Sequence, residues 1–258
     1  MNLKRWLPLA VLFVFFSQSA KPVISEEPLL ATLLHVRESV VRITAEAGGA
    51  ITKAPELVPG PNGKMLALRS IKPIYLKREG AGVILTEWGL IVTNAHTVDN
   101  SGRITVTLDD ETKHEARLEH LDHESDVAFL RIMNQNPLHA VKLSEAAQIN
   151  FNSEVYSIGN SKFLNNTLSS GSIRGKKTIR FQSGENAPLI EIGMDTYHGD
   201  SGTPVLDKEG SLLGIVASGS PSRHASYAIP VNTIRKQLAA YLESLKKPEV
   251  NGGTPPVS

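Results

Sequence analysis

Ser201 lies in a glycine-rich stretch, between Asp200 and Gly202, with Gly199 two positions before it. Glycines permit a tight turn and a close approach of the backbone to a ligand. In such a turn the N–H groups of Gly199 and Ser201 could point the same way, beside the Ser201 hydroxyl. A nucleophile next to two convergent donors is what acyl transfer needs, because the donors stabilise the developing oxyanion. An ordinary hairpin loop has the same residues, so both interpretations stay open.

A serine hydroxyl is a weak nucleophile and needs a base, usually histidine, that a carboxylate orients. His96 differs from the other histidines because it ends the apolar strand predicted at 90–96, which would hold its side chain rigidly at the start of a loop. His120 and His123 have the spacing of helical metal ligands, but their segment is predicted as strand and loop, which disfavours zinc. The remaining candidates lie in charged or loop-like surroundings and are predicted at the surface: His35, His114, His139 and His224.

Asp126 is the candidate carboxylate. It directly precedes the apolar segment 127–130, so it should be more buried than Asp122 and Glu124 nearby. A buried carboxylate must be paired, and a histidine would supply the partner. The alternative is a turn aspartate that opens a strand.

Three motifs resemble those of the chymotrypsin-like serine proteases, in the same order and with similar spacings of 30 and 75 residues. Within that family the chain most resembles the HtrA/Deg branch of exported bacterial quality-control proteases. Segments 40–43, 80–84, 158–160, 170–171 and 228–230 share in the resemblance, which covers about residues 30–245. The three motifs are Thr93-Asn94-Ala95-His96, Ser125-Asp126-Val127-Ala128 and Gly199-Asp200-Ser201-Gly202-Thr203-Pro204.

The resemblance implies a serine endopeptidase without a cofactor or metal, in which Ser201 attacks the scissile carbonyl. His96 would move the proton and Asp126 would orient the imidazole. The oxyanion hole would lie at residues 199–201, with the N–H groups of Gly199 and Ser201 as donors and Asp200 supporting the turn. Relatives usually have asparagine and glycine where this chain has Asp200 and Thr203. They also have PDZ domains after the protease, and none is expected here.

Substrate specificity is open at this stage. Asp195 occupies the place where trypsin has the aspartate that binds arginine or lysine, which favours cleavage after basic residues. HtrA proteases also have an aspartate in this region but prefer small aliphatic residues. Tyr197 and His198 could narrow the pocket or pack within their loop, and Ala217, Ser218 and Gly219 fit the strand that pairs with the substrate backbone.

The elements that must hold these residues are mostly strands. Apolar and β-branched segments separated by turn residues indicate an all-β barrel or sandwich, and the resemblance implies a chymotrypsin-like double β-barrel. The barrels are expected at about 38–145 and 150–232, within a protease domain at 26–246. The predicted strands are 39–44, 80–86, 90–96, 104–108, 116–121, 127–132 and 140–143, then 154–159, 168–174, 178–182, 189–194, 203–206, 212–218 and 226–229.

Helices are predicted at the two ends of this domain. Leucines at helical spacing indicate a short N-terminal helix at 26–37, and a C-terminal closing helix is expected at 233–246. Between the first strands, residues 48–73 contain several prolines and glycines and are predicted as a long loop. Residues 247–258 are rich in glycine and proline and are predicted as a disordered tail.

Composition and the N-terminus indicate the compartment and partners. The formal net charge of +1 and the scattered basic residues give no sign of nucleic-acid binding. The chain has no cysteine, which excludes disulfides and a cysteine nucleophile. Residues 1–20 have the layout of a signal peptide, so we expect a periplasmic or secreted protein, without membrane insertion if the peptide is cleaved. An uncleaved anchor is the alternative.

Polypeptides are the expected substrates, and the resemblance implies a role in protein quality control. It also implies a homotrimer formed near residues 26–75, although that segment lacks a clear aromatic cluster. One alternative is a non-catalytic or conditionally active chaperone or binding module on the same fold. Another is an esterase that uses the same three residues.

Overall fold

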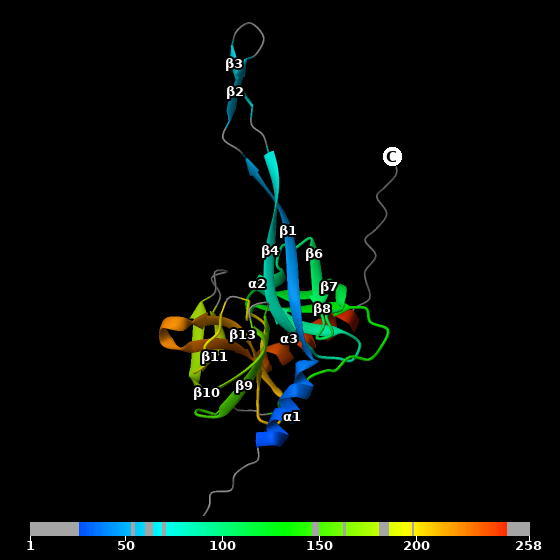
Figure 1. Ribbon diagram of the computed structural model, residues 1–258, viewed down its shortest axis with the longest axis vertical. Coiled ribbons are helices and arrows are strands. Elements are labelled where there is room, and N and C mark those ends of the chain that lie inside the picture. Colours follow the sequence, from blue (N-terminus) through cyan, green and yellow to red (C-terminus); the bar gives the residue numbers. More distant parts are fainter. Residues whose placement is uncertain are drawn as a thin grey trace, which may run out of the picture.

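The structure, a computed structural model, describes residues 26–52, 55–59, 64–68, 71–145, 150–161, 164–180, 186–197 and 199–246. In these ranges the chain forms two closed antiparallel barrels of six strands each (Figure 1). The predicted all-β double barrel, with a short N-terminal helix and a C-terminal helix, is therefore confirmed. The signal peptide expected at 1–20, the tail at 247–258 and His198 lie outside the described residues.

The first barrel has the strand order β1-β4-β5-β8-β7-β6 and closes where β1 pairs with β6. Side chains alternate along β1, so that Val41, Ile43 and Ala45 are buried inside the barrel. Its strands are β1 Val40–Thr52, β4 Ile71–Ile84, β5 Leu90–Asn94, β6 Arg103–Thr107, β7 Lys113–Asp122 and β8 Val127–Ile132.

The second barrel has the order β10-β11-β14-β13-β12-β9. Two of the predicted strands, 168–174 and 178–182 as far as Arg180, are one strand with an irregularity between Ile173 and Gly175, and residues 181–182 lie outside the described residues. The strand predicted at 140–143 does not form, and Leu143 makes only an isolated bridge to Leu212. The strands are β9 Glu154–Ser161, β10 Leu164–Arg180, β11 Asn186–Ile192, β12 Pro204–Leu206, β13 Leu212–Ser220 and β14 Ala225–Pro230.

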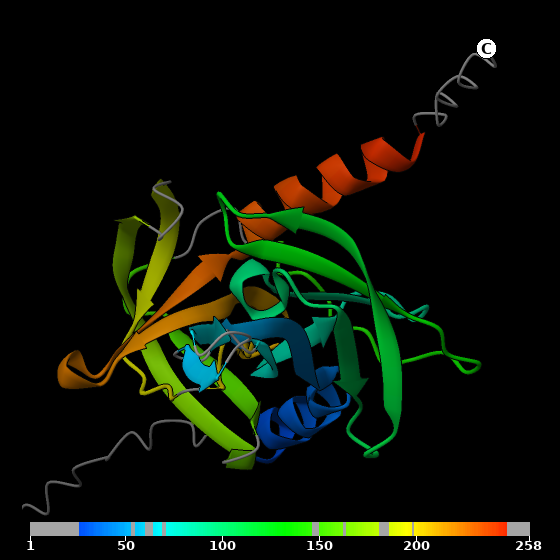
Figure 2. The same cartoon turned by 90° about the horizontal axis from the view of Figure 1, so that it is seen from above.

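A further apolar cluster joins the two barrels. It contains Val92 and Phe129 of the first barrel, Ile229 of the second, Leu33 of α1 (Glu26–Arg37) and Tyr241 of α3 (Val231–Lys246). Figure 2 shows α1 and α3 on opposite sides of the barrels. Because the helices and both barrels share this cluster, residues from different barrels can meet in a fixed geometry. None of the helices in the described ranges is long and apolar enough to cross a membrane.

The prediction of a loop at 48–73 is wrong for its described part. Strands β1 and β4 stay paired from Val40–Val83 out to Thr52–Ile71 and form a ribbon that rises from the barrel (Figure 1). A second pair, β2 (Glu56–Pro59) and β3 (Met65–Leu68), continues it. Proline is tolerated because both strands of a two-stranded ribbon are edge strands, where a missing N–H need not break a ladder.

Candidate active site

His96 lies on a one-turn helix, α2 (Ala95–Val98), that follows β5 directly. The prediction that His96 ends a strand is therefore wrong. The Ala95 N–H donates to the backbone oxygen of Asp126 at 3.1 Å. The Asp99 N–H donates to the backbone oxygen of Ala95 at 2.8 Å and closes the helical turn. The chain turns here because a neighbouring loop supplies an acceptor, which the local sequence does not reveal.

Asp126 lies in the turn before β8 and has a backbone φ of +57°, a left-handed conformation that aspartate adopts more readily than most residues. Its Oδ1 accepts a hydrogen bond from the His96 N–H at 2.9 Å. Its Oδ2 contacts His96 Nδ1 at 2.8 Å and accepts one from Asn94 Nδ2 at 3.1 Å. Asp126 is only 4% exposed, and these bonds compensate for the burial of its carboxylate.

Ser201 completes a chain of hydrogen bonds. Its Oγ lies 3.1 Å from His96 Nε2, on the side of the ring opposite to Asp126. The structure thus joins the nucleophile candidate, the base candidate and its orienting carboxylate within hydrogen-bond reach. The His96 side chain is 49% exposed, so a substrate can reach it.

The Ser201 turn is bonded to both barrels. The Ala81 N–H of β4 donates to the Ser201 backbone oxygen at 2.7 Å, and the Gly202 N–H donates to Val216 of β13 at 2.8 Å. Gly202 has a φ of +88°, and a Cβ there would lie 1.9 Å from the Ala81 oxygen. Only glycine permits this close approach.

Residues 199–201, the predicted oxyanion hole, divide into two groups. No described residue accepts a hydrogen bond from the N–H of Gly199 or Ser201, so both donors stay available. The Asp200 N–H instead donates to Tyr197 at 3.1 Å, and Asp200 Oδ2 accepts from the Tyr197 N–H at 2.7 Å. Asp200 therefore closes the turn on itself and offers no N–H to a ligand.

The other oxygen of Asp200 has no hydrogen-bond partner among the described residues. The residue is 6% exposed, and its Oδ1 is buried without a hydrogen bond among the described residues. It lines a cavity of about 420 Å³ behind the turn. The other residues around this cavity are Ser157, Gly159, Ser169, Ser170, Met194, Asp195, Thr196, Tyr197 and Thr203.

The predicted specificity residues occupy different environments. Asp195 is a surface residue with a 44% exposed side chain that contacts His224 Nδ1 at 3.1 Å. Tyr197 is 60% exposed at the edge of the turn. On β13, Ala217 is buried, whereas Ser218 and Gly219 are exposed.

The sequence reasoning missed Thr196, which lies between Asp195 and Tyr197. Thr196 is buried and accepts a hydrogen bond from Ser226 Oγ at 3.0 Å. A Cβ on Gly219 would come within 2.3 Å of Thr196 Oγ1, so this side chain fills the space beside β13. Its neighbours Asp195 and Tyr197 stood out in the sequence, but nothing distinguished Thr196.

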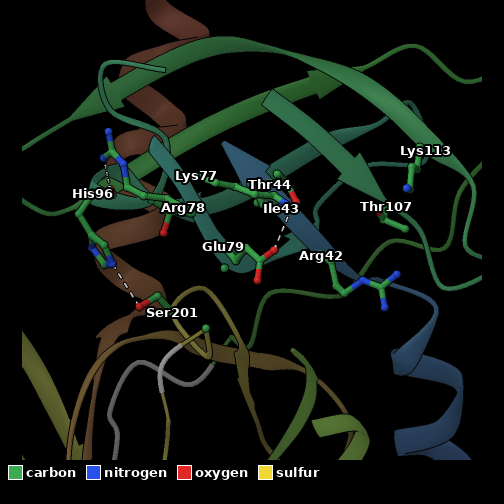
Figure 3. A pocket seen from close by; sticks show the side chains of 13 residues that line it. Arg42, Ile43, Thr44, Lys77, Arg78, Glu79, His96, Thr107, Lys113 and Ser201 are labelled. Carbon is green, nitrogen blue, oxygen red and sulfur yellow. Dashed lines mark hydrogen bonds and ion pairs between the residues drawn. The ribbon is translucent and has the colours of Figure 1, made fainter. Parts of the chain in front are cut away.

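A larger cavity, of about 620 Å³, lies on the other side of Ser201, against the first barrel (Figure 3). Sequence reasoning missed it as well, because strand pairing assembles its lining from distant segments. Its lining comprises Arg42, Ile43, Thr44, Lys77, Arg78, Glu79, Gly80, His96, Thr97, Thr107, Lys113, Gly199 and Ser201.

Potential metal ligands lie apart from Ser201. In the described part of the chain, the one group of three that comes together is His35, Glu38 and His139, all exposed, with Glu38 already paired to His139 at 2.8 Å. His120 contacts Gln237 at 3.0 Å, and His123 lies 3.8 Å from Asp99. The two histidines with metal-ligand spacing thus have separate partners.

Comparison with known proteins places this geometry in a family. The model of the trypsin-like peptidase domain matches residues 80–215, a range that contains His96, Asp126 and Ser201. The chain belongs to the trypsin-like peptidase family.

Its curated relatives include HtrA serine proteases. The chain is 31% identical over 189 residues to serine protease HTRA1A of Danio rerio, an alignment that covers 68% of this chain and 38% of the relative. It is 30% identical over 189 residues to serine protease HTRA4 of Homo sapiens, covering 72% and 39%. To the chloroplastic Protease Do-like 1 of Arabidopsis thaliana it is 34% identical over 163 residues, covering 60% and 37%. The chain thus spans about four tenths of these relatives.

Proposed function

We propose that the chain is a serine endopeptidase that hydrolyses peptide bonds through an acyl-enzyme on Ser201. The observation that supports this most is the unbroken series of contacts from Asp126 through His96 to Ser201. A fold and a family alone do not give a function, whereas a nucleophile, a base and an orienting group in contact define acyl-transfer chemistry.

Each residue has a separate role in the reaction. As Ser201 Oγ attacks the scissile carbonyl, His96 Nε2 takes its proton and later gives it to the leaving amine. The negative charge that develops on the carbonyl oxygen is stabilised by the N–H groups of Gly199 and Ser201, which donate to no described residue. Asp126 keeps the proton on Nδ1 of His96 and stabilises the imidazolium. In the second half of the reaction His96 takes a proton from water, which attacks the ester carbonyl, and then gives a proton to Ser201 Oγ as the carboxylic acid product leaves.

For the residue before the scissile bond we propose a small aliphatic side chain. Thr196 fills the space beside Gly219, and Asp195 is already engaged with His224. A pocket narrowed in this way rejects large side chains on steric grounds.

Export and protein quality control are proposed on other grounds. The signal-like pattern of residues 1–20 supports export to the periplasm or beyond. The resemblance to the HtrA/Deg branch of quality-control proteases supports a role in quality control, and the relatives named as HtrA serine proteases agree with that branch. A homotrimer through the ribbon is proposed because Leu57, Met65 and Leu66 expose about half or more of their surface there: 61%, 55% and 48%.

A fluorophosphonate probe tests the proposed reaction directly. It should label the folded protein covalently and lose all labelling in Ser201→Ala. Ser222→Ala, a change at an exposed serine outside the site, is the matched control and should label normally. If the folded protein is never labelled, the chemistry proposed for Ser201 is wrong and a non-catalytic binding role is favoured. If Ser201 is labelled, comparing the hydrolysis of peptide and simple ester substrates distinguishes a protease from an esterase.

A further inference from the structure

The 620 Å³ cavity lies on the side of Ser201 where the leaving part of a substrate must go. His96 protonates the leaving amine, so the segment after the scissile bond passes over the histidine. His96 lines this cavity, together with Gly80 and Thr97 of the same barrel. The cavity therefore receives the leaving segment of the substrate. This step depends on the proposed function.

The cavity has an excess of positive charge. Four cationic side chains line it, and one carboxylate, Glu79, does so. Two of the cations have acidic partners: Lys77 lies 3.1 Å from Glu79, and Arg42 pairs with Glu111 outside the lining. Neither of these two ion pairs involves Arg78 or Lys113.

Arg78 and Lys113 have no carboxylate partner among the described residues. The Arg78 guanidinium donates to the backbone oxygens of His96, at 2.7 Å, and Asp99. These neutral acceptors fix the guanidinium beside α2 without cancelling its charge. Lys113 is exposed, and no described acidic group pairs with it. Both cations can therefore attract an anionic ligand.

Strand register places Lys113 in the lining of this cavity, although Lys113 is distant in sequence from Ser201. Arg42 of β1 pairs with Thr107 of β6, which pairs with Lys113 of β7. Cross-strand partners stand side by side on one face of a sheet. Figure 3 shows the result, with His96 and Ser201 at one end of the lining and Arg42 and Lys113 at the other. The Arg78 guanidinium lies beside His96 at the first end, and a substrate segment that extends from Ser201 along the lining reaches Lys113 at the other end.

We infer that this cavity selects substrates with a carboxylate among the first few residues after the scissile bond. The carboxylate can belong to an aspartate or glutamate side chain or to the C-terminus of the substrate. An exposed ion pair contributes roughly 0.2–1 kcal/mol, so each free cation should change kcat/KM about threefold. Arg78 and Lys113 together should favour an acidic over a basic leaving segment about tenfold at low salt, and less at high salt because the charges are screened.

The test uses peptides with one constant acyl half and variable leaving halves. One series has a blocked C-terminus and an internal Asp, Gln or Lys, and a second has neutral side chains with a free or an amidated C-terminus. Higher kcat/KM for Asp in the first series, or for the free terminus in the second, identifies the carboxylate that the cavity binds. If neither increases kcat/KM, the inference is wrong.

Variants at Lys113 assign the effect to the cavity. Lys113→Gln should reduce the acidic preference about threefold, and Lys113→Glu should abolish it, because the introduced carboxylate offsets the remaining charge of Arg78. Lys236→Gln, an exposed lysine on α3, is the matched control. An acidic preference that persists in Lys113→Glu overturns the assignment to this cavity.

A binding measurement separates this inference from the proposed function. Fluorescence anisotropy of labelled peptides with Ser201→Ala reports occupancy without turnover. If the probe of Ser201 fails but carboxylate peptides still bind more tightly than lysine peptides, the proposed chemistry is wrong and the charge selection stands. If Ser201 reacts but binding and cleavage ignore the charge, the chemistry stands and the selection is wrong.

Discussion

Two walls flank Ser201: a first-barrel wall that contains Asp126, and a second-barrel wall that contains Asp200. Their buried carboxylates are held in different ways. On the first-barrel wall, both oxygens of the Asp126 carboxylate are hydrogen-bonded, and the partners include the backbone and the ring of His96. On the second-barrel wall, the Asp200 carboxylate bonds through one oxygen, and its other oxygen is buried without a described partner beside a cavity. A buried carboxylate with both oxygens hydrogen-bonded is held firmly, whereas one with an unbonded oxygen carries a desolvation cost.

This difference separates the two halves of the site by function. We expect changes to Asp126 to remove chemistry while the fold persists, because its partners belong to one compact motif. We expect changes around Asp200 and Gly202 to alter the shape of the turn that presents Ser201. Measuring kcat and the free energy of unfolding on the same variants therefore distinguishes the two walls.

The largest kinetic effect is expected for Asp126→Asn. The amide cannot hold His96 in the tautomer that accepts a proton from Ser201, so kcat should fall by about 10⁴-fold. Asparagine also adopts the left-handed backbone, so the free energy of unfolding should change by less than about 2 kcal/mol. Steady-state kinetics and urea unfolding measure both quantities.

Asp122→Asn is the control for this variant. Asp122 accepts hydrogen bonds from Ser125 and Gln237 but does not contact His96. It should lower stability with kcat nearly unchanged. Equal losses of kcat in the two variants would show that Asp126 acts only by supporting the fold.

Gly202→Ala should have the largest effect on stability. The new Cβ meets the Ala81 oxygen at 1.9 Å, and the φ of +88° adds strain for a residue with a side chain. We expect a loss of at least about 3 kcal/mol in the free energy of unfolding. Gly48→Ala is the control because nothing lies within 4 Å of its added Cβ. A Gly202→Ala protein as stable as the control would mean that the barrels separate easily at this point.

Asp200 tests the second wall with a smaller effect. Asp200→Ala removes the acceptor for the Tyr197 N–H, so the turn loosens and kcat should fall roughly 30-fold, about 2 kcal/mol. Asp200→Asn keeps an oxygen for that N–H and removes a buried charge with one unpaired oxygen, so it should retain at least about a third of wild-type activity. An Asn variant as inactive as the Ala variant would show that the negative charge itself is required.

The sequence predicted the first of these walls better than the second. Helical spacing of leucines gave the bounds of α1, and an apolar run gave those of β8, residue for residue. His96, Asp126 and Ser201 stood out because each adjoins a recognisable apolar or glycine-rich segment. These are local patterns, and local patterns are what one sequence contains.

Features that depend on tertiary contacts could not be predicted. The helix α2 forms because the backbone of Asp126 offers an acceptor to Ala95, and the ribbon forms because residues 48–52 pair with residues 71–75 on the other side of a proline-rich segment. The basic cavity needs the register that joins Arg42 to Lys113. The environment of Asp195 depends on a hairpin 29 residues away.

Asp195 therefore gives the last and smallest test, on the second wall. Its exposed carboxylate contacts His224, and exposed pairs of this kind contribute little energy. If the buried Thr196 sets the pocket, Asp195→Asn should change kcat/KM by less than about threefold for substrates with valine or with arginine before the scissile bond. Cleavage-site profiling on a proteome-derived peptide mixture measures both together. A selective loss of cleavage after arginine and lysine would instead make Asp195 the specificity residue, because its carboxylate would then leave His224 to bind the substrate.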